Sequence, residues 1–196
     1  RLAGYRVDFD VFGLHHLAEK GWSLVVYPAG LQMRYSGFMT ANHLRFVTED
    51  IVWQEVPGEV SLAFLLSGCP LRCPGCHSAG AWKAGVGTVL TEDYLTSRLK
   101  QYQGLISCVL FLGGEWQPEA LGALLRMVQE AGLKTCLYTG LERNELPGGL
   151  LPYLTYLKTG RWQAELGGLD RPASNQQFIH LPSGENLNHL FQGKQT

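Results

Sequence analysis

The sequence lacks the features that mark several protein classes. It has no run of about 18 apolar residues, so no membrane-spanning helix is expected. It has no block of Lys or Arg and a formal net charge of -1, which argues against nucleic acid as a main partner. Residues 1–10 carry two aspartates and no apolar segment before a small-residue cleavage site, so they do not resemble a secretory signal. We therefore expect a cytoplasmic protein with no membrane partner, in which clustered cysteines indicate metal binding or catalysis.

Cysteine is scarce, but it is concentrated in one place. Three of the five cysteines, Cys69, Cys73 and Cys76, follow the spacing C-x3-C-x2-C, and two prolines and Gly75 within this stretch suit a tight loop. Cysteine thiolates are the usual ligands of iron–sulfur clusters, and a [4Fe–4S] cluster needs four ligands to be fully coordinated. Three local thiolates would leave one iron open, and an open position distinguishes a catalytic metal site from a structural one.

A structural zinc site and a disulfide framework account less well for these cysteines. A structural zinc site needs a fourth ligand, but His77 follows Cys76 too closely to bind the same ion easily, and no second C-x2-C or H-x3-H pair occurs. A disulfide framework is typical of secreted proteins with an even number of cysteines, and neither condition is met. The spacing therefore favours an iron–sulfur cluster.

The chain length suits one domain with extensions. A chain of 196 residues, 45% of them hydrophobic, can bury one substantial core. We expect an N-terminal extension over residues 1–40, a domain that carries the cysteines over residues 41–181, and a C-terminal tail over residues 182–196. The extension shows only a possible short helix over Phe12–Lys20 and a possible strand over Ser23–Tyr27. We expect residues 1 to about 32, which precede Met33, to be an extension or upstream sequence rather than catalytic machinery.

Strand and helix patterns alternate after about Asn42, which predicts an α/β fold. The apolar run Val60–Leu66 predicts a buried strand that ends just before the cysteine loop. Further strands are expected over Ile106–Leu112, Leu133–Tyr138, Tyr153–Lys158 and Gln177–Leu181, and helices over Glu92–Gln103 and from Pro118 to Gly132, with a helical turn near Glu142. The alternation predicts a mostly parallel sheet. A complete eight-unit barrel takes roughly 250 residues, so we expect an incomplete parallel β/α barrel.

A second candidate motif, Gly113-Gly114-Glu115, ends the predicted strand Ile106–Leu112. Glycines at the end of a strand let the backbone approach a ligand closely, and a neighbouring carboxylate can accept a hydrogen bond from an ammonium group. By itself the motif is weak evidence, because many proteins contain a Gly-Gly turn followed by a solvated Glu.

The cysteine spacing and the later Gly-Gly-Glu motif together resemble the radical S-adenosylmethionine (SAM) family. The resemblance implies a [4Fe–4S] cluster held by Cys69, Cys73 and Cys76, with SAM bound to the open iron. It implies that Gly113, Gly114 and Glu115 hold the amino group of SAM, and that no catalytic side chain is needed beyond the cluster ligands.

Further stretches resemble one subfamily, the activating proteins of anaerobic ribonucleotide reductase. They are Ser67-Gly68-Cys69, Cys73-Pro74-Gly75-Cys76, Trp82, Tyr138-Thr139-Gly140 and Ser174-Asn175-Gln176, and the similarity runs from about Asn42 to Leu181. It implies that the protein forms a 5'-deoxyadenosyl radical and installs a glycyl radical on the large subunit of the reductase. It also implies a low-potential electron donor such as flavodoxin.

The same resemblance places Thr139 and Gly140 in the cofactor site. Lys158, at the end of a predicted strand on the same edge, is a candidate to contact the carboxylate of SAM. The stretch Lys158-Thr159-Gly160 departs from the subfamily, because some members carry an acidic residue before this glycine. The tail after Leu181 is also unlike the subfamily.

The remaining candidate residues suit ordinary structural roles. Cys108 and Cys136 lie within apolar strands and are expected to be structural. His15, His16, His43, His180 and His189 share no spacing with the cysteines, and Trp53 and Trp82 suit core or interface anchors.

Three alternative functions stay open. An electron-transfer module would need a fourth cysteine ligand, and a radical SAM enzyme that acts on a small molecule should need more chain to enclose its substrate. The third alternative is an activating protein of another glycyl-radical enzyme.

Overall fold

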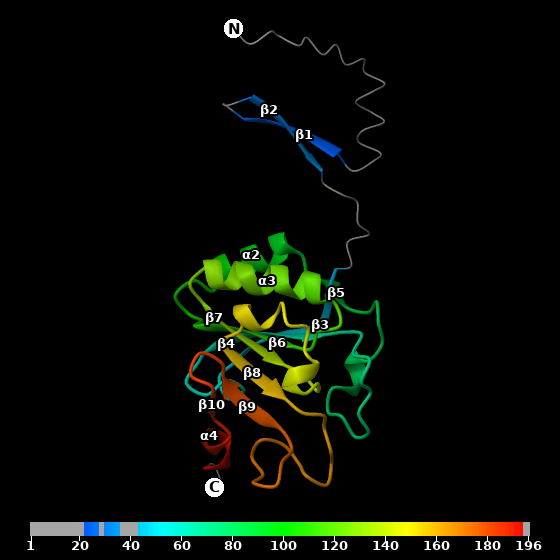
Figure 1. Ribbon diagram of the computed structural model, residues 1–196, viewed down its shortest axis with the longest axis vertical. Coiled ribbons are helices and arrows are strands. Elements are labelled where there is room, and N and C mark those ends of the chain that lie inside the picture. The colour runs from blue at the N-terminus through cyan, green and yellow to red at the C-terminus, as the bar shows by residue number, and fades with distance from the viewer. Residues whose placement is uncertain (1–21, 28–29, 36–42, 194–196) are drawn as a thin grey trace. The chain divides into compact units, whose positions relative to one another are not determined.

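The structure is a computed structural model that describes residues 22–27, 30–35 and 43–193. The chain divides into two compact units, Arg1–Asn42 and His43–Thr196. In the first unit β1 (Trp22–Tyr27) pairs with β2 (Gly30–Tyr35) in an antiparallel hairpin (Figure 1). The strand predicted over Ser23–Tyr27 coincides with β1, whereas the helix predicted over Phe12–Lys20 lies outside the described residues.

The second unit is built on a sheet with the strand order β10-β9-β8-β7-β6-β4-β3-β5. Its central strands, which are parallel, are β4 (Ser61–Leu66), β6 (Cys108–Leu112), β7 (Lys134–Tyr138) and β8 (Tyr156–Thr159). The flanking strands, which pair antiparallel, are β3 (Arg45–Val52), β5 (Thr88–Val89), β9 (Gln177–His180) and β10 (Glu185–Asn186). The α/β prediction is therefore confirmed, but the sheet is mixed rather than mostly parallel.

The connection between β8 and β9 explains part of this difference. A parallel neighbour requires a crossover connection, usually through a helix. Residues 160–176 contain turns and bends but no helix, so the chain re-enters the sheet from the edge at which β8 ended. The strand predicted over Gln177–Leu181 is present as β9, and it runs antiparallel to β8.

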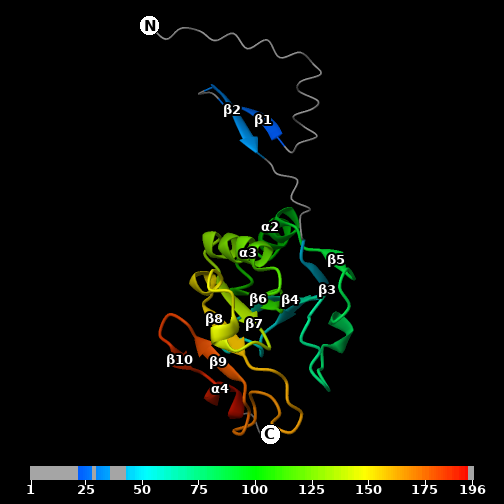
Figure 2. The same cartoon turned by 45° about the vertical axis from the view of Figure 1, so that its right-hand side comes forward.

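Two helices cover one face of this sheet. They are α2 (Glu92–Gln101) and α3 (Pro118–Glu130), which lie side by side in Figures 1 and 2. The Thr91 side chain caps α2 by accepting a hydrogen bond from the Tyr94 backbone N–H at 3.0 Å, and Pro118 stands in the first turn of α3. The larger core lies beneath these helices and includes Leu95, Leu121, Leu125 and Val128 against Phe64, Val109 and Phe111.

The opposite face of the sheet is covered by irregular segments and short elements. Its core consists of Val56, Ala63, Cys108, Leu110, Cys136, Tyr156, Leu169 and Phe178, with Leu187 and Phe191 packed against it. Phe191 belongs to α4 (His189–Gln192). The short 3-10 helices of the unit are η1 (Ala79–Ala81), η2 (Arg143–Glu145) and η3 (Leu151–Tyr153).

The strand β3 was not expected from the sequence. Its middle carries Glu49 and Asp50, which interrupt the apolar pattern of a strand. The Glu49 side chain, 8% exposed, forms an ion pair with Arg98 of α2 and accepts a hydrogen bond from the hydroxyl of Tyr94. Because Tyr94 and Arg98 of α2 pair with Glu49, this charged residue can lie on the face of the sheet that α2 covers.

Candidate functional site

Four loops meet at the carboxyl edge of the parallel strands. The cysteine loop follows β4, Gly113–Trp116 follows β6, Thr139–Gly140 follows β7, and Gly160 follows β8. Because the carboxyl ends of parallel strands share one edge of a sheet, residues far apart in the sequence come together there.

The cysteine loop is held in shape by backbone hydrogen bonds. The Gly68 N–H donates to the Ala81 carbonyl at 2.7 Å and so closes the loop, while the Cys76 N–H donates to the Cys73 carbonyl at 3.1 Å. Three residues adopt positive φ, namely Gly68 at 99°, Arg72 at 45° and Gly75 at 70°. Arg72 is the only non-glycine residue with positive φ in the described part of the chain, so the loop holds it in a conformation that favours glycine.

All three loop thiols line one cavity of about 160 Å³. All five cysteines are free thiols, and Cys108 and Cys136 are buried within β6 and β7 rather than at this cavity. Burial raises the pKa of the Cys69 thiol, and the charge of Glu115 adds to this effect, while hydrogen bonds from the backbone N–H groups of the loop oppose it. The backbone N–H of Ser78 donates to the Cys76 sulfur at 3.4 Å.

The three loop thiols are the candidate ligands of an iron–sulfur cluster. Within residues 22–27, 30–35 and 43–193, no group of three or more His, Cys, Asp or Glu side chains is arranged to hold a metal ion. Three free thiols line one cavity wall and the two other cysteines lie elsewhere, which agrees in number with the three protein ligands predicted for a [4Fe–4S] cluster.

Glu115 presents an unpaired carboxylate oxygen at the same cavity. Its side chain is only 4% exposed, and its Oε1 accepts a hydrogen bond from the Thr139 hydroxyl at 2.8 Å. Its Oε2 is buried and has no partner among the residues that the structure describes. Burial raises the pKa of Glu115, against hydrogen bonds from its own backbone N–H and from Thr139. A buried acceptor without a partner is unusual and suits a cationic ligand group.

Gly113 and Gly114 serve the fold around Glu115 in a way that the sequence did not indicate. Both have positive φ, 89° and 103°. A Cβ on Gly113 would lie 2.5 Å from the Trp116 ring, and a Cβ on Gly114 would lie 2.5 Å from Leu66. The missing side chain of Gly114 therefore makes room for Leu66 of the core.

Lys158 and Gly140 complete the cavity wall. Burial lowers the pKa of Lys158 to about 8, although the charges of Cys73 and Cys76 oppose the shift. The Lys158 ammonium lies 5.9 Å from the ring centroid of Tyr138. A Cβ on Gly140 would lie 2.6 Å from Leu71, so this glycine admits a side chain of the cysteine loop. The structure thus brings all nine predicted site residues to one edge of the sheet.

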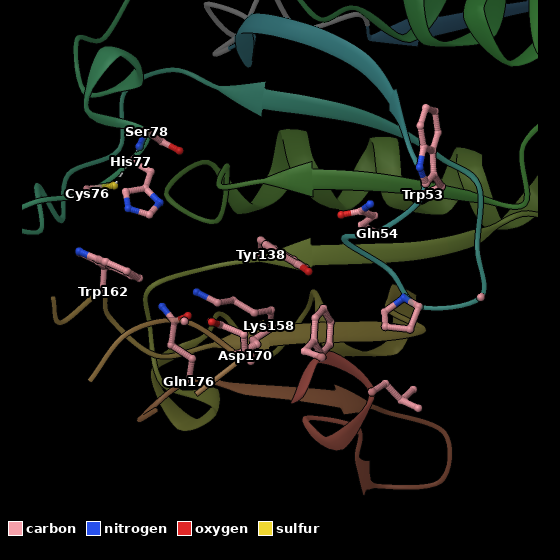
Figure 3. Close-up of a pocket in the computed structure, with 16 residues that line it drawn as sticks. Trp53, Gln54, Cys76, His77, Ser78, Tyr138, Lys158, Trp162, Asp170 and Gln176 are labelled. Atoms are coloured by element: carbon pink, nitrogen blue, oxygen red, sulfur yellow. Dashed lines mark hydrogen bonds between the residues drawn. The ribbon is translucent and has the colours of Figure 1, made fainter. Parts of the chain in front are cut away.

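A second, larger cleft of about 820 Å³ adjoins this cavity and shares Cys76, Tyr138 and Lys158 with it. Figure 3 shows the cleft with Cys76, His77 and Ser78 at one end and Trp53 and Gln54 at the other. The sequence analysis missed Gln54, Trp162, Asp170 and Gln176 as lining residues. Gln54 follows β3, and Trp162 and Asp170 lie between β8 and β9, where no local pattern marks them. Gln176 was named only as part of the Ser174-Asn175-Gln176 stretch.

The described part of the chain contains no helix that is both long and apolar enough to cross a membrane.

Comparisons with known proteins agree with this site. A family model described as "4Fe-4S single cluster domain" matches residues 56–179. The anaerobic ribonucleoside-triphosphate reductase-activating protein of Vibrio cholerae is 29% identical over 153 residues, which is 71% of this chain and 97% of that protein. The protein of the same name from Escherichia coli is 26% identical over 155 residues, or 71% of this chain and 99% of that protein.

A relative with a different name matches a shorter region. The 7-carboxy-7-deazaguanine synthase of Hyperthermus butylicus is 33% identical over 84 residues, which cover 42% of this chain and 35% of that protein.

These matches confirm several predictions made from the sequence. They bear out the resemblance to the reductase-activating proteins, the radical SAM class of enzyme, and the cofactors, a [4Fe–4S] cluster and SAM. Because the family model covers more than half of the chain, including all three loop cysteines, the chain belongs to the 4Fe-4S single cluster domain family.

Proposed function

We propose that this protein activates an anaerobic ribonucleotide reductase by installing a glycyl radical on its large subunit. The observation that carries the proposal is the small cavity, where three free thiols and the unpaired oxygen of Glu115 meet. Two reductase-activating proteins aligned over 97% and 99% of their own lengths support the choice of partner. The proposal places the protein in the cytoplasm, where thiols stay reduced.

The cofactors supply the redox chemistry and the chain supplies their binding. When bound, the cluster and SAM supply the electron transfer and carbon–sulfur bond cleavage that give a 5'-deoxyadenosyl radical. Cys69, Cys73 and Cys76 hold the cluster through their thiolates. A low-potential donor such as flavodoxin provides the electron.

The other cavity residues bind and orient SAM in this proposal. Glu115 accepts a hydrogen bond from the ammonium group through Oε2, because Oε1 is already paired with Thr139. The Thr139 hydroxyl also accepts a hydrogen bond from the Leu141 N–H at 3.0 Å, so its own proton is directed to Glu115. Lys158 faces the carboxylate of SAM, and Gly113, Gly114 and Gly140 permit the close packing around these groups.

The larger cleft suits a protein substrate. Trp53, at the end of this cleft away from Cys76, is 66% exposed. A large exposed aromatic side chain beside an open cleft is typical of a surface that a partner covers. The reductase would close the cleft and exclude water from the radical.

We also propose that the second unit is an incomplete β/α barrel of the radical SAM type. Its parallel strands β4, β6, β7 and β8 carry helices on one face, and the site lies at their carboxyl edge. The antiparallel strands β3 and β9 flank this parallel set and would end the barrel on each side.

An activation assay tests this function. The protein is reconstituted with iron and sulfide without oxygen, reduced with flavodoxin, and incubated with SAM and the purified large subunit. We expect a glycyl-radical signal on the large subunit by electron paramagnetic resonance that requires both SAM and reductant. SAM cleavage without any radical on the reductase would contradict this choice of partner.

The match to the deazaguanine synthase supports a second candidate, a radical SAM enzyme that acts on a small molecule. In that case SAM cleavage would be stimulated by a small-molecule substrate and not by the reductase. The same assay separates the two candidates, since each predicts stimulation by a different additive.

A further inference from the structure

Trp162 carries a buried hydrogen-bond donor that has no acceptor. Its indole Nε1 is buried and has no partner among the described residues. The indole N–H can only donate, and leaving a buried donor unpaired is costly. The structure therefore raises the question of which group accepts this hydrogen bond.

The indole lies against the cysteine loop. A Cβ placed on Gly75, between Cys73 and Cys76, would be only 3.4 Å from the Trp162 Nε1. Trp162 lines the small cavity together with the three cysteines. Its ring also packs on His77, with ring centroids 4.6 Å apart and planes tilted by 48°, and Figure 3 shows it beside Cys76 and His77.

The segment that carries Trp162 is fixed at its base. The Gln176 side-chain amide donates to the Gly160 carbonyl at 3.3 Å, and the Asn175 amide donates to the Arg161 carbonyl at 2.9 Å. Gly160 has φ of 95°, and a Cβ there would lie 2.9 Å from the Asn175 carbonyl oxygen. Trp162, which follows Arg161 directly, is thus positioned by the Ser174-Asn175-Gln176 stretch rather than left free.

We infer that the Trp162 N–H donates a hydrogen bond to a sulfur atom of the cluster assembly, either a cysteine thiolate or a cluster sulfide. The three thiols share the cavity wall with the indole, and its Nε1 lies against Gly75, between Cys73 and Cys76. The other acceptor of this cavity that lacks a partner among the described residues, Glu115 Oε2, binds the ammonium of SAM in the proposed function. Hydrogen bonds to the sulfurs and solvent exposure set the potential of an iron–sulfur cluster. A donor stabilises the extra negative charge of the reduced cluster, so Trp162 makes reduction easier.

The test compares the midpoint potentials of the parent and of Trp162→Phe, which keeps an aromatic ring but removes the N–H. The potential of the reconstituted cluster is measured by redox titration in the absence of SAM and reductase. We expect it to become more negative, with a several-fold smaller equilibrium constant for reduction; a tenfold change corresponds to about 59 mV for one electron. Trp53→Phe is the matched control, because Trp53 lines only the larger cleft, and it should keep the parent potential.

A second variant covers the case in which Trp162→Phe fails to hold the cluster. Replacing Trp162 with 3-benzothienylalanine substitutes sulfur for the N–H at nearly constant shape. A more negative potential supports the inference. The inference is also supported if the variant fails to hold the cluster after reconstitution while its cluster-free form unfolds at the same temperature as the cluster-free parent. An unchanged potential overturns the inference. Cluster loss together with a lowered unfolding temperature also overturns it, since Trp162 would then be structural. No outcome depends on the reductase, so failure here is distinct from failure of the proposed function.

Discussion

At the scale of single residues, environment separates the five cysteines into two groups. Cys108 and Cys136 are fully buried in strands, and burial raises the pKa of the Cys108 thiol to about 12 and that of Cys136 well above its ordinary value. Both therefore stay protonated at neutral pH and behave as small apolar side chains. The other three lie on a loop where backbone N–H groups approach the sulfur atoms of Cys69 and Cys76.

Cys69→Ala, Cys73→Ala and Cys76→Ala are each expected to abolish the iron–sulfur absorbance and SAM cleavage together. The reason is that thiolate coordination holds the iron, and the described cavity offers no fourth cysteine to replace a lost ligand. Visible absorbance and iron content after anaerobic reconstitution measure the loss. Cys108→Ala and Cys136→Ala should retain both properties; a folded Cys108→Ala protein without a cluster would show that the ligand set is wrong.

Glu115→Gln is expected to weaken SAM binding without changing the cluster content. A charge-assisted hydrogen bond contributes about 1.5–3 kcal/mol, and about 1.4 kcal/mol corresponds to a factor of ten. The dissociation constant should therefore rise roughly ten- to a hundredfold. Equilibrium dialysis on cluster-loaded protein measures it. Glu119→Gln, the same change at an exposed position on α3, is the control. If Glu115→Gln binds SAM as tightly as the parent, then Glu115 Oε2 does not bind the ammonium group of SAM.

At the scale of elements, the strand ends hold the site in shape through close packing. Gly114 is the clearest case, because it has a φ of 103° and a Cβ there would meet Leu66, Leu44 and Leu121 of the core. The turn after β6 can therefore aim Glu115 into the cavity only if this position has no side chain.

Gly114→Ala is expected to lower the free energy of unfolding by about 1–3 kcal/mol, since the added methyl group overpacks the core and the backbone conformation disfavours it. Gly104→Ala is the matched control, because Gly104 also has a positive φ, 75°, but a Cβ there would meet nothing within 4 Å. Urea unfolding of the cluster-free proteins compares the two. Equal losses would mean that backbone strain alone explains the effect and that the contact with Leu66 is unimportant.

The elements that the sequence predicted well are those with strong local signals. The apolar runs at β4, β6 and β7 and the capped, periodic helices α2 and α3 were placed to within one to two residues. β3 was missed because its buried Glu49 depends on partners in α2. The direction of β9 was missed because no local sequence pattern shows that the connection from β8 to β9 contains no helix.

The residues of the candidate site also differ in whether the sequence could predict them. The cysteines, Gly113-Gly114-Glu115 and Lys158 carry recognisable spacing or stand at strand ends, so the sequence could single them out. Trp162 could not be found from the sequence, because its position against Gly75 depends on hydrogen bonds from Asn175 and Gln176. The sequence also could not show that Gly114 makes room for the core, because its contact with Leu66 is tertiary.

At the scale of the whole second unit, the two edges of the parallel strands differ in how their buried polar groups are paired. The carboxyl edge holds buried polar atoms that have no partner among the described residues at the small cavity, namely Glu115 Oε2 and Trp162 Nε1. At the amino edge Glu59 is buried, forms an ion pair with Lys134 at the start of β7, and accepts a hydrogen bond from the Tyr156 hydroxyl at 3.0 Å. The amino edge thus holds a satisfied network that ties three strands together.

Charge at this network makes the stability of the unit depend on pH. Burial alone would raise the pKa of Glu59, but hydrogen bonds from Lys134, Ser107 and Tyr156 and the charge of Lys134 outweigh it and hold the pKa below its ordinary value. A carboxyl group whose pKa is lowered on folding makes its full contribution to stability at pH values above its pKa in the unfolded state. This contribution is lost as the pH falls through the folded pKa. The hydrogen bond to Glu59 raises the pKa of Lys134, so its contribution is complete below its unfolded pKa and is lost at strongly alkaline pH.

Glu59→Gln is therefore expected to destabilise the cluster-free protein at pH 7 but much less at about pH 3. We expect a loss of roughly 1–2 kcal/mol at pH 7, at the lower end for a hydrogen bond to a charged group because the Lys134 side chain is 49% exposed and solvent screens the pair. Urea unfolding at both pH values measures the difference, and Glu130→Gln, at an exposed position of α3, should be neutral at both. An equal loss for Glu59→Gln at pH 7 and pH 3 would mean that the charge of Glu59 contributes nothing and that only its packing matters.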